Sequence, residues 1–147
     1  MTTLICDDID EDGICDDEDD CVGLYDVCGE CNGDGSSCSV DVTFSVDMSI
    51  EGVVGDIKVR TSTVNGEYLP SDWFVMDDSD GDMIYTYTMT LITGIEYGYN
   101  FNNSDGSVYE SGSTIADCAG GSYGNDRIVT PGADNMVLDT VCWESCE

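Results

Sequence analysis

An alternating acidic motif near the N-terminus contains the residues best suited to chemistry. Residues 8–21 read Asp-Ile-Asp-Glu-Asp-Gly-Ile-Cys-Asp-Asp-Glu-Asp-Asp-Cys and fill every fixed position of the pattern D-x-D-x-D-G-x-x-D-x-x-D-x-C. A hard cation such as Ca²⁺ takes about six to eight oxygen ligands, and alternate carboxylates around a glycine turn supply them. The spacing therefore predicts a calcium site whose ligands are Asp8, Asp10, Asp12, the backbone carbonyl of Ile14, Asp16 and Asp19.

The alternative interpretation of this segment is a solvated acidic run, which is what most charge runs are. A random acidic tract would rarely place Gly13 and the two cysteines in register, so the spacing favours a metal site. The last ligand position holds Asp19 in place of the bidentate Glu of an EF-hand, and no amphipathic helix flanks the loop. Ten acids within residues 7–20 repel one another, so we expect calcium binding to be coupled to the folding of this segment.

Residues 6–21 resemble a thrombospondin type 3 calcium repeat, and one complete repeat is present. The resemblance implies that aspartate side chains ligate calcium in a segment with little regular structure, while cysteines bridge successive turns. The positions that match the family's motif are Asp8, Asp10, Asp12, Asp16 and Asp19, with Cys21 as a disulfide partner.

Nine cysteines, about 6% of the chain, indicate an oxidising compartment and hence a secreted, extracellular or cell-surface protein. Cys28 and Cys31 form a CxxC motif, which can serve a zinc site or a redox dithiol. A zinc site would need a fourth soft ligand, and a redox dithiol would need a helix after the motif, whereas the residues that follow here are rich in glycine. Structural disulfides are the favoured use. The odd count leaves one thiol free or joined to another chain, from the candidates Cys6, Cys15, Cys21, Cys28, Cys31, Cys38, Cys118, Cys142 and Cys146.

The charge is distributed unevenly and indicates two parts, an Asp/Cys-rich arm at 1–39 and a second domain at 40–147. The arm holds 13 acids, no base and six cysteines, whereas the remainder holds 19 acids and all three bases. The net charge is 3 − 32 = −29, which opposes a nucleic-acid partner because so few side chains could meet a phosphate. No stretch approaches the roughly 20 apolar residues of a membrane span.

From residue 40 onward the hydrophobic pattern has a period of two, which is typical of strands. Residues 40–48 alternate apolar and polar side chains, and turn pairs such as Asp80-Gly81 and Thr93-Gly94 separate the later segments. The expected strands lie at about 40–48, 53–61, 72–76, 83–91, 95–102, 126–130 and 135–142. We therefore predict a mainly β fold, an antiparallel β-sandwich behind an N-terminal arm that lacks regular structure.

Four separated motifs in residues 40–147 resemble an immunoglobulin-like, starch-binding-like β-sandwich module of large secreted bacterial proteins. They are residues 42–48 (VTFSVDM), 78–85 (DSDGDMIY), 98–101 (GYNF) and 141–146 (VCWESC). The resemblance implies a non-catalytic module with a role in glycan binding or surface attachment. The stretch before Trp73 departs from the family's short Asn-Gly-Trp turn.

Two further groups of residues in the second domain suggest ligands. Asp78, Asp80 and Asp82 offer alternate carboxylates for a second calcium ion, although a polar turn would use the same residue types. Aromatic residues could line a platform for sugars, although on alternating strands they more often form core or cross-strand pairs. The aromatic candidates are Trp73, Tyr85, Tyr87, Tyr97, Tyr99, Tyr109 and Trp143.

The sequence favours a binding or structural role over catalysis. The chain contains no His, which excludes Ser-His and Cys-His catalysis, and a domain of this size leaves little room for the cleft of a glycosidase. One hypothesis is an extracellular structural subunit that associates with copies of itself, as a homo-oligomer or helical filament, with calcium offsetting charge repulsion. The other is a carbohydrate-binding module of a larger secreted protein, with glycans as partners.

Overall fold

The computed structural model describes residues 6–63, 72–103, 110, 115–117, 119–120 and 126–146. The chain divides into two compact units, Met1–Ser39 and Val40–Glu147, at the position where the density of acids and cysteines changes. Among the described residues no helix is both long enough and apolar enough to cross a membrane.

The N-terminal unit is held by covalent crosslinks with little regular structure. Its regular elements among the described residues are the short 3₁₀ helix η1 (Ser36–Cys38) and an isolated bridge between Tyr25 and Cys31. Three disulfides join Cys6 to Cys15, Cys21 to Cys31 and Cys28 to Cys38. Each closes a loop of about ten residues, which in the chain-entropy picture stabilises the folded form by about 2–3 kcal/mol. The disulfides therefore stabilise this unit in place of a hydrophobic core. The prediction of a disulfide-stabilised arm is confirmed.

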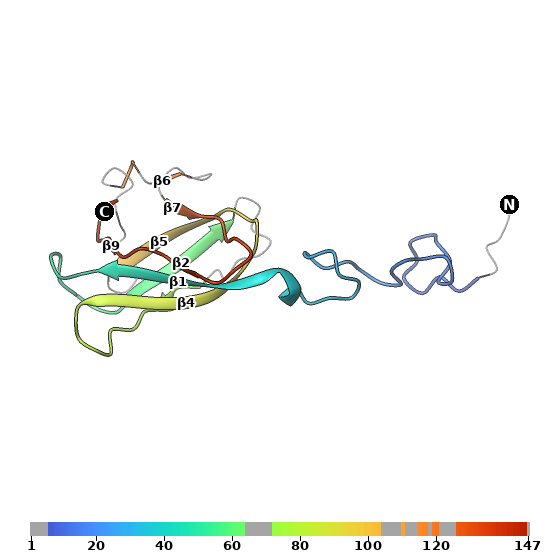
Figure 1. The fold of residues 1–147 in the computed structure, drawn as a ribbon, viewed down its shortest axis with the longest axis horizontal. Coiled ribbons are helices and arrows are strands. Elements are labelled where there is room, and N and C mark those ends of the chain that lie inside the picture. The colour runs from blue at the N-terminus through green and yellow to red at the C-terminus, as the bar shows by residue number, and fades with distance from the viewer. Residues whose placement is uncertain are drawn as a thin grey trace. The chain divides into compact units, whose positions relative to one another are not determined.

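The second unit is built from two sheets, which confirms the prediction of a β-sandwich (Figure 1). One sheet has the order β4-β1-β8, with β9 also pairing to β1, and the other has the order β3-β2-β5-β7-β6. The strands are β1 (Ser39–Asp47), β2 (Ile57–Thr63), β3 (Phe74–Val75), β4 (Ile84–Ile92), β5 (Tyr97–Asn103), β6 (Ala119–Gly120), β7 (Asp126–Val129), β8 (Met136–Val137) and β9 (Val141–Cys142).

The strand directions differ from the prediction in the sheet that contains β1. The pairings of β2 with β3 and β5, and of β7 with β5 and β6, are antiparallel as expected. However, β8 and β9 both run parallel to β1, so this sheet is mixed. β1 lies at the start of the unit, whereas β8 and β9 lie at its end. No hairpin therefore joins them to β1, and nothing requires the antiparallel direction that a hairpin imposes.

The single strand expected at 135–142 is in fact two short strands on one side of β1. Between β8 and β9 the contact with β1 continues through a hydrogen bond from Leu138 N to Thr43 O (3.0 Å) and a contact between the hydroxyls of Ser45 and Thr140 (2.9 Å). The C-terminal segment therefore follows β1 along most of its length.

The core lies between the two sheets and follows the alternation of the sequence. Val42, Phe44 and Val46 of β1 are fully buried and face the apolar side chains of β2 and β5. The rings of Phe44 and Tyr99 meet edge to face at 5.0 Å, which is a favoured aromatic geometry.

Several aromatic candidates for a sugar platform belong to this core. Tyr97, Tyr99 and Trp143 are buried in it, and the partly buried Tyr85 and Tyr87 pack against it. Tyr109 lies outside the described residues. The core interpretation of the buried aromatics therefore agrees with the structure.

Candidate metal centre

Three of the predicted ligands converge in the N-terminal unit. One carboxylate oxygen from each of Asp8, Asp10 and Asp12 lies within 4.8 Å of the other two. A calcium ion about 2.4 Å from each ligand can be shared by oxygens up to about 4.8 Å apart. The three side chains can therefore contact one cation.

Backbone amides fix one oxygen of each of these carboxylates. Gly13 N donates to Asp8 Oδ2 (3.1 Å), Ile14 N donates to Asp12 Oδ1 (2.8 Å), and Gly23 N donates to Asp10 Oδ2 (2.7 Å). Gly13 has a φ of 93°, a left-handed conformation that glycine adopts without strain. The turn at Gly13 thus brings the amides of the loop back towards the carboxylates.

Three carboxylate oxygens of the arm are buried, two of them in the cluster and one on Asp19. Asp8 Oδ1, Asp10 Oδ1 and Asp19 Oδ2 are shielded from solvent and make no hydrogen bond with any residue that the structure describes. A buried carboxylate oxygen without a partner is costly, because it has lost its hydration and gained nothing in exchange. A cation bound by these oxygens would remove that cost.

The remaining predicted ligands occupy different places. Asp16 Oδ1 accepts a hydrogen bond from Ile9 N (3.0 Å), and Asp19 Oδ1 accepts one from Cys21 N (2.8 Å). Neither residue belongs to the cluster of three carboxylates, although Asp19 keeps one buried oxygen without a partner. Ile14 lies beside the cluster, where its amide binds Asp12.

The second acidic motif also forms a cluster, in the loop between β3 and β4. One oxygen from each of Asp78, Asp80 and Asp82 lies within 4.8 Å of the others. Asp78 Oδ1 is buried and has no hydrogen-bond partner in the described part of the chain, while Asp82 Oδ1 accepts a hydrogen bond from Ile84 N (2.8 Å). Burial, followed by the negative charge of Asp78, raises the pKa of the nearby Tyr85.

Asp26 organises the second half of the arm, a role that the sequence analysis did not predict. Its Oδ1 accepts hydrogen bonds from Cys28 N (2.8 Å) and Glu30 N (2.9 Å), and its Oδ2 accepts one from Gly35 N (2.7 Å). The bonds from Glu30 and Gly35 are the main causes that lower the pKa of Asp26. Because the folded pKa is lowered, this stabilisation is present above pH 3.8 and is lost as the pH falls below that value.

The cysteines of the CxxC belong to different disulfides, so a redox dithiol and a zinc site are both wrong for this motif. Cys28 pairs with Cys38 and Cys31 pairs with Cys21. In the second unit Cys146 is disulfide-bonded, whereas Cys118 lies outside the described residues. Cys142 is a free cysteine.

One thiol per chain is therefore expected when the oxidised protein is titrated with a thiol reagent in denaturant. The half-buried Cys142 should react more slowly in the folded protein than after unfolding, because a shielded thiol is less accessible. Cys142→Ser should remove the signal, while the exposed Ser49→Ala should leave it unchanged. A value near one in the Cys142→Ser protein would mean that another cysteine is free.

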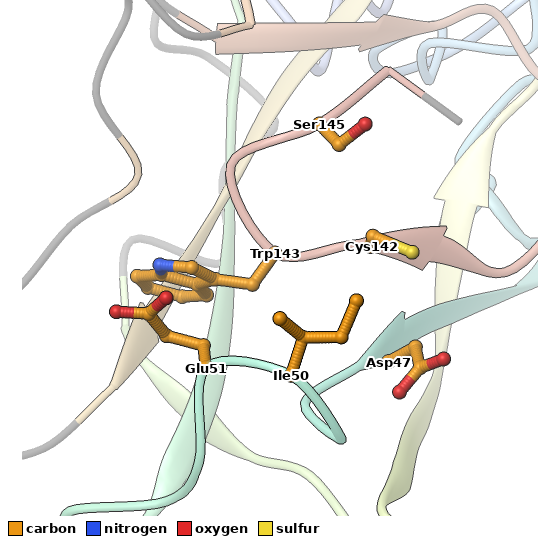
Figure 2. Close-up of a pocket in the computed structure, with 6 residues that line it drawn as sticks. All are labelled: Asp47, Ile50, Glu51, Cys142, Trp143 and Ser145. Atoms are coloured by element: carbon orange, nitrogen blue, oxygen red, sulfur yellow. The ribbon is translucent and has the colours of Figure 1, made fainter.

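Cys142 lines a small cavity in the second unit (Figure 2). The cavity has a volume of about 220 Å³ and is lined by Asp47, Ile50, Glu51, Cys142, Trp143 and Ser145. A hydrogen bond from the backbone of Ser49, followed by one from its side chain, lowers the pKa of Asp47. The volume lies below the roughly 300–1,000 Å³ usual for small-molecule sites.

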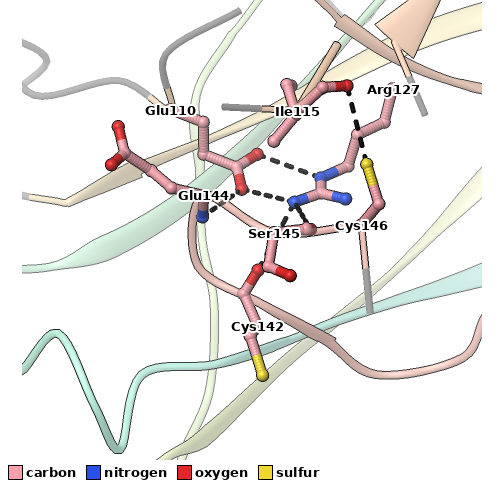
Figure 3. A network of polar contacts seen from close by, with 7 residues as sticks. All are labelled: Glu110, Ile115, Arg127, Cys142, Glu144, Ser145 and Cys146. Carbon is pink, nitrogen blue, oxygen red and sulfur yellow. Dashed lines mark hydrogen bonds and ion pairs between the residues drawn. The ribbon is translucent and has the colours of Figure 1, made fainter. Parts of the chain in front are cut away.

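The second unit contains a buried ion pair between Arg127 and Glu110 that the sequence analysis did not predict (Figure 3). Arg127 Nε lies 3.1 Å from Glu110 Oε2, and Arg127 Nη2 lies 2.6 Å from Glu110 Oε1. The two side chains are only 3% and 0% exposed. Arg127 Nη2 also donates to Ser145 O (2.6 Å), and Glu144 N donates to Glu110 Oε1 (3.0 Å). The pair thereby connects β7 to the C-terminal segment that follows β9.

Fold and site together define a two-part protein, a disulfide-linked acidic unit and a two-sheet β unit, each with an aspartate cluster that could hold a metal ion. No protein-family model matches the chain, and no curated protein matches its sequence.

Proposed function

We propose that this protein is a non-catalytic, calcium-binding structural or adhesive module that works outside the cell or at its surface. The observation that carries the proposal is the set of buried carboxylate oxygens without partners in the arm. In each of Asp8, Asp10 and Asp19 a backbone amide holds one oxygen, which leaves the other free for a cation. Oxygen ligands alone, without His or thiolate, suit a hard ion such as calcium.

The disulfides support an extracellular location. Three disulfides within the first 38 residues would not persist in a reducing cytosol, and the unit has little else to hold it together. A cation in the arm also reduces the repulsion among its acids. Copies of a chain of charge −29 need such neutralisation before they can associate, so we propose that calcium permits self-association into a surface or extracellular assembly, in the form of an oligomer or filament.

Isothermal titration calorimetry of the full oxidised chain tests the calcium site. We expect binding of calcium in preference to magnesium, because the smaller ion demands a stricter octahedral geometry. Asp10→Asn should weaken calcium binding at the arm by at least about 10–100-fold, because that is the cost of losing even an outer-shell partner of a metal ligand. Asp17→Asn is the matched control, since Asp17 is an exposed acid of the same loop that lies outside the cluster.

Equal calcium binding by the wild-type, Asp10→Asn and Asp17→Asn proteins would contradict the proposed site. Asp80→Asn distinguishes the second cluster, because it should remove one binding event from the second unit and leave that of the arm intact. Sedimentation velocity with calcium and then with chelator tests the assembly separately. Calcium binding without any association would leave the metal site standing and contradict the self-association.

A further inference from the structure

The two bases that are not used in the core lie together on one face of the five-stranded sheet. The chain has three bases, and Arg127 forms the buried pair with Glu110. Lys58 and Arg60 form no ion pair with any described residue. They are two positions apart on β2, where Ile57, Val59 and Thr61 point into the core, so both face outward.

The strand pairing gives this outer face two similar rows of side chains. Lys58 lies between Val75 on β3 and Asn102 on β5. Arg60 lies opposite Asn100, and its guanidinium carbon sits 4.7 Å from the centre of the Trp73 ring. Each row therefore combines an apolar side chain, a cation and an amide.

Part of this face is exposed and incompletely paired. Val75 on β3 and Ile128 on β7 are 54% and 44% exposed, although both are large apolar residues on strands. Asn100 is only 6% exposed, and its Oδ1 makes no hydrogen bond with the described residues. The acids at this face include Asp126, whose Oδ2 accepts a hydrogen bond from the Ser62 hydroxyl (3.4 Å), and the exposed Asp56, two positions before Lys58. We call the surface formed by Lys58, Arg60, Trp73, Val75 and Ile128 the basic face.

The N-terminal unit has the complementary properties. It carries 13 acids and no base, and within residues 7–20 five exposed acids lie outside the cluster of Asp8, Asp10 and Asp12: Asp7, Glu11, Asp17, Glu18 and Asp20. It also exposes large apolar side chains, with Ile9, Leu24 and Tyr25 at 77%, 82% and 60%. Acidic and apolar side chains together match a surface that offers cations beside apolar residues.

We infer that the basic face of one copy binds the acidic N-terminal unit of a second copy. This inference rests on the self-association proposed above and assigns its interface. Contact between two different surfaces is heterologous, so it extends from copy to copy into a chain or ring. Calcium bound by Asp8, Asp10 and Asp12 would leave the five exposed acids free to meet Lys58 and Arg60.

Sedimentation velocity of the calcium-saturated full chain tests the basic face. Lys58→Gln/Arg60→Gln should weaken self-association at least tenfold, whereas Arg60→Lys, which keeps the charge, should weaken it less. The double variant changes the net charge to −31. Its matched control is Thr86→Glu/Val137→Glu, which reaches the same charge at exposed positions of the other sheet and should associate like the wild type.

A mixing experiment tests whether the partner surface is the arm. Asp17→Asn/Glu18→Gln/Asp20→Asn should likewise weaken self-association at least tenfold while retaining calcium binding. When this arm variant is mixed with Lys58→Gln/Arg60→Gln, each supplies the intact surface that the other lacks. The mixture should form one-to-one dimers and nothing larger. The surfaces left unpaired in such a dimer are the substituted arm of one copy and the substituted basic face of the other, and neither can bind a third copy.

Three results would overturn this inference. The first is full association of Lys58→Gln/Arg60→Gln in a protein whose wild type assembles, which would leave the proposed function intact. The second is a mixture that remains monomeric. The third is a Lys58→Gln/Arg60→Gln protein that associates like the wild type but no longer binds an acidic polysaccharide such as alginate. That result would make the basic face a glycan site. A wild-type protein that never associates would contradict the self-association itself.

Discussion

Glu110→Gln is expected to lower the free energy of unfolding of the β unit by about 3–5 kcal/mol, the usual cost of removing one partner from a buried ion pair. The guanidinium of Arg127, 3% exposed, would keep its charge and lose both carboxylate contacts. The amide of Glu144 would also lose a charged acceptor. Urea denaturation followed by the fluorescence of Trp143, which is 8% exposed in the core, measures the change.

Two variants control for this prediction. Glu96→Gln makes the same chemical change at an exposed position in the turn before β5 and should alter stability by less than about 0.5 kcal/mol. Glu110→Leu/Arg127→Met removes both charges, and such double replacements are often close to neutral. The double variant should therefore be more stable than Glu110→Gln. A Glu110→Gln protein as stable as Glu96→Gln would mean that the buried pair does not hold the C-terminal segment.

Calcium is expected to slow amide hydrogen exchange in the arm by up to about 1,000-fold when its concentration is 1,000 times the dissociation constant. A ligand that binds only the folded form stabilises it by about 4 kcal/mol under that condition. The relevant amides are those that donate to the clustered carboxylates, Gly13, Ile14 and Gly23. Without the ion, repulsion among the acids should open these hydrogen bonds readily.

The β unit provides the internal reference for that measurement. In the Asp80→Asn protein, which lacks the second cluster, and at a concentration too low for association, amides in the ladder between β2 and β5 should exchange at the same rate with calcium and with chelator, because their hydrogen bonds do not involve the arm. Asp10→Asn should abolish the protection of Gly23, whose amide donates directly to Asp10. Equal exchange at Gly13, Ile14 and Gly23 with and without calcium would contradict an ion-organised arm.

Short-range features of this protein could be predicted from the sequence. The alternation of Val42, Phe44 and Val46 indicates a strand with one buried face, and the structure buries all three. The spacing of Asp8, Asp10 and Asp12 places their carboxylates on one turn, and the structure brings them within 4.8 Å of one another. In both cases the residues that interact are separated by only a few positions, so local geometry decides the outcome.

Long-range features could not be predicted, because periodicity contains no information about which strands become neighbours. The parallel course of β8 along β1 joins Val42 to Met136, from opposite ends of the unit. The hydrogen bond from Gly23 to Asp10 spans 13 positions, and the pair of Arg127 and Glu110 spans 17. Arginine and glutamate usually lie on the surface, so nothing in the sequence indicates that Arg127 and Glu110 are buried. Only the fold shows it.

The disulfides of the arm also limit how far it can be stretched. The loops closed by Cys21–Cys31 and Cys28–Cys38 overlap, so tension passes from one sulfur bridge through three peptide units to the next. With 5.4 Å between the α-carbons of each bridge, the ends of residues 21–38 can separate by only about 20 Å, against about 60 Å for the uncrosslinked chain. Under mechanical load this stretch would behave as a short, nearly inextensible tether.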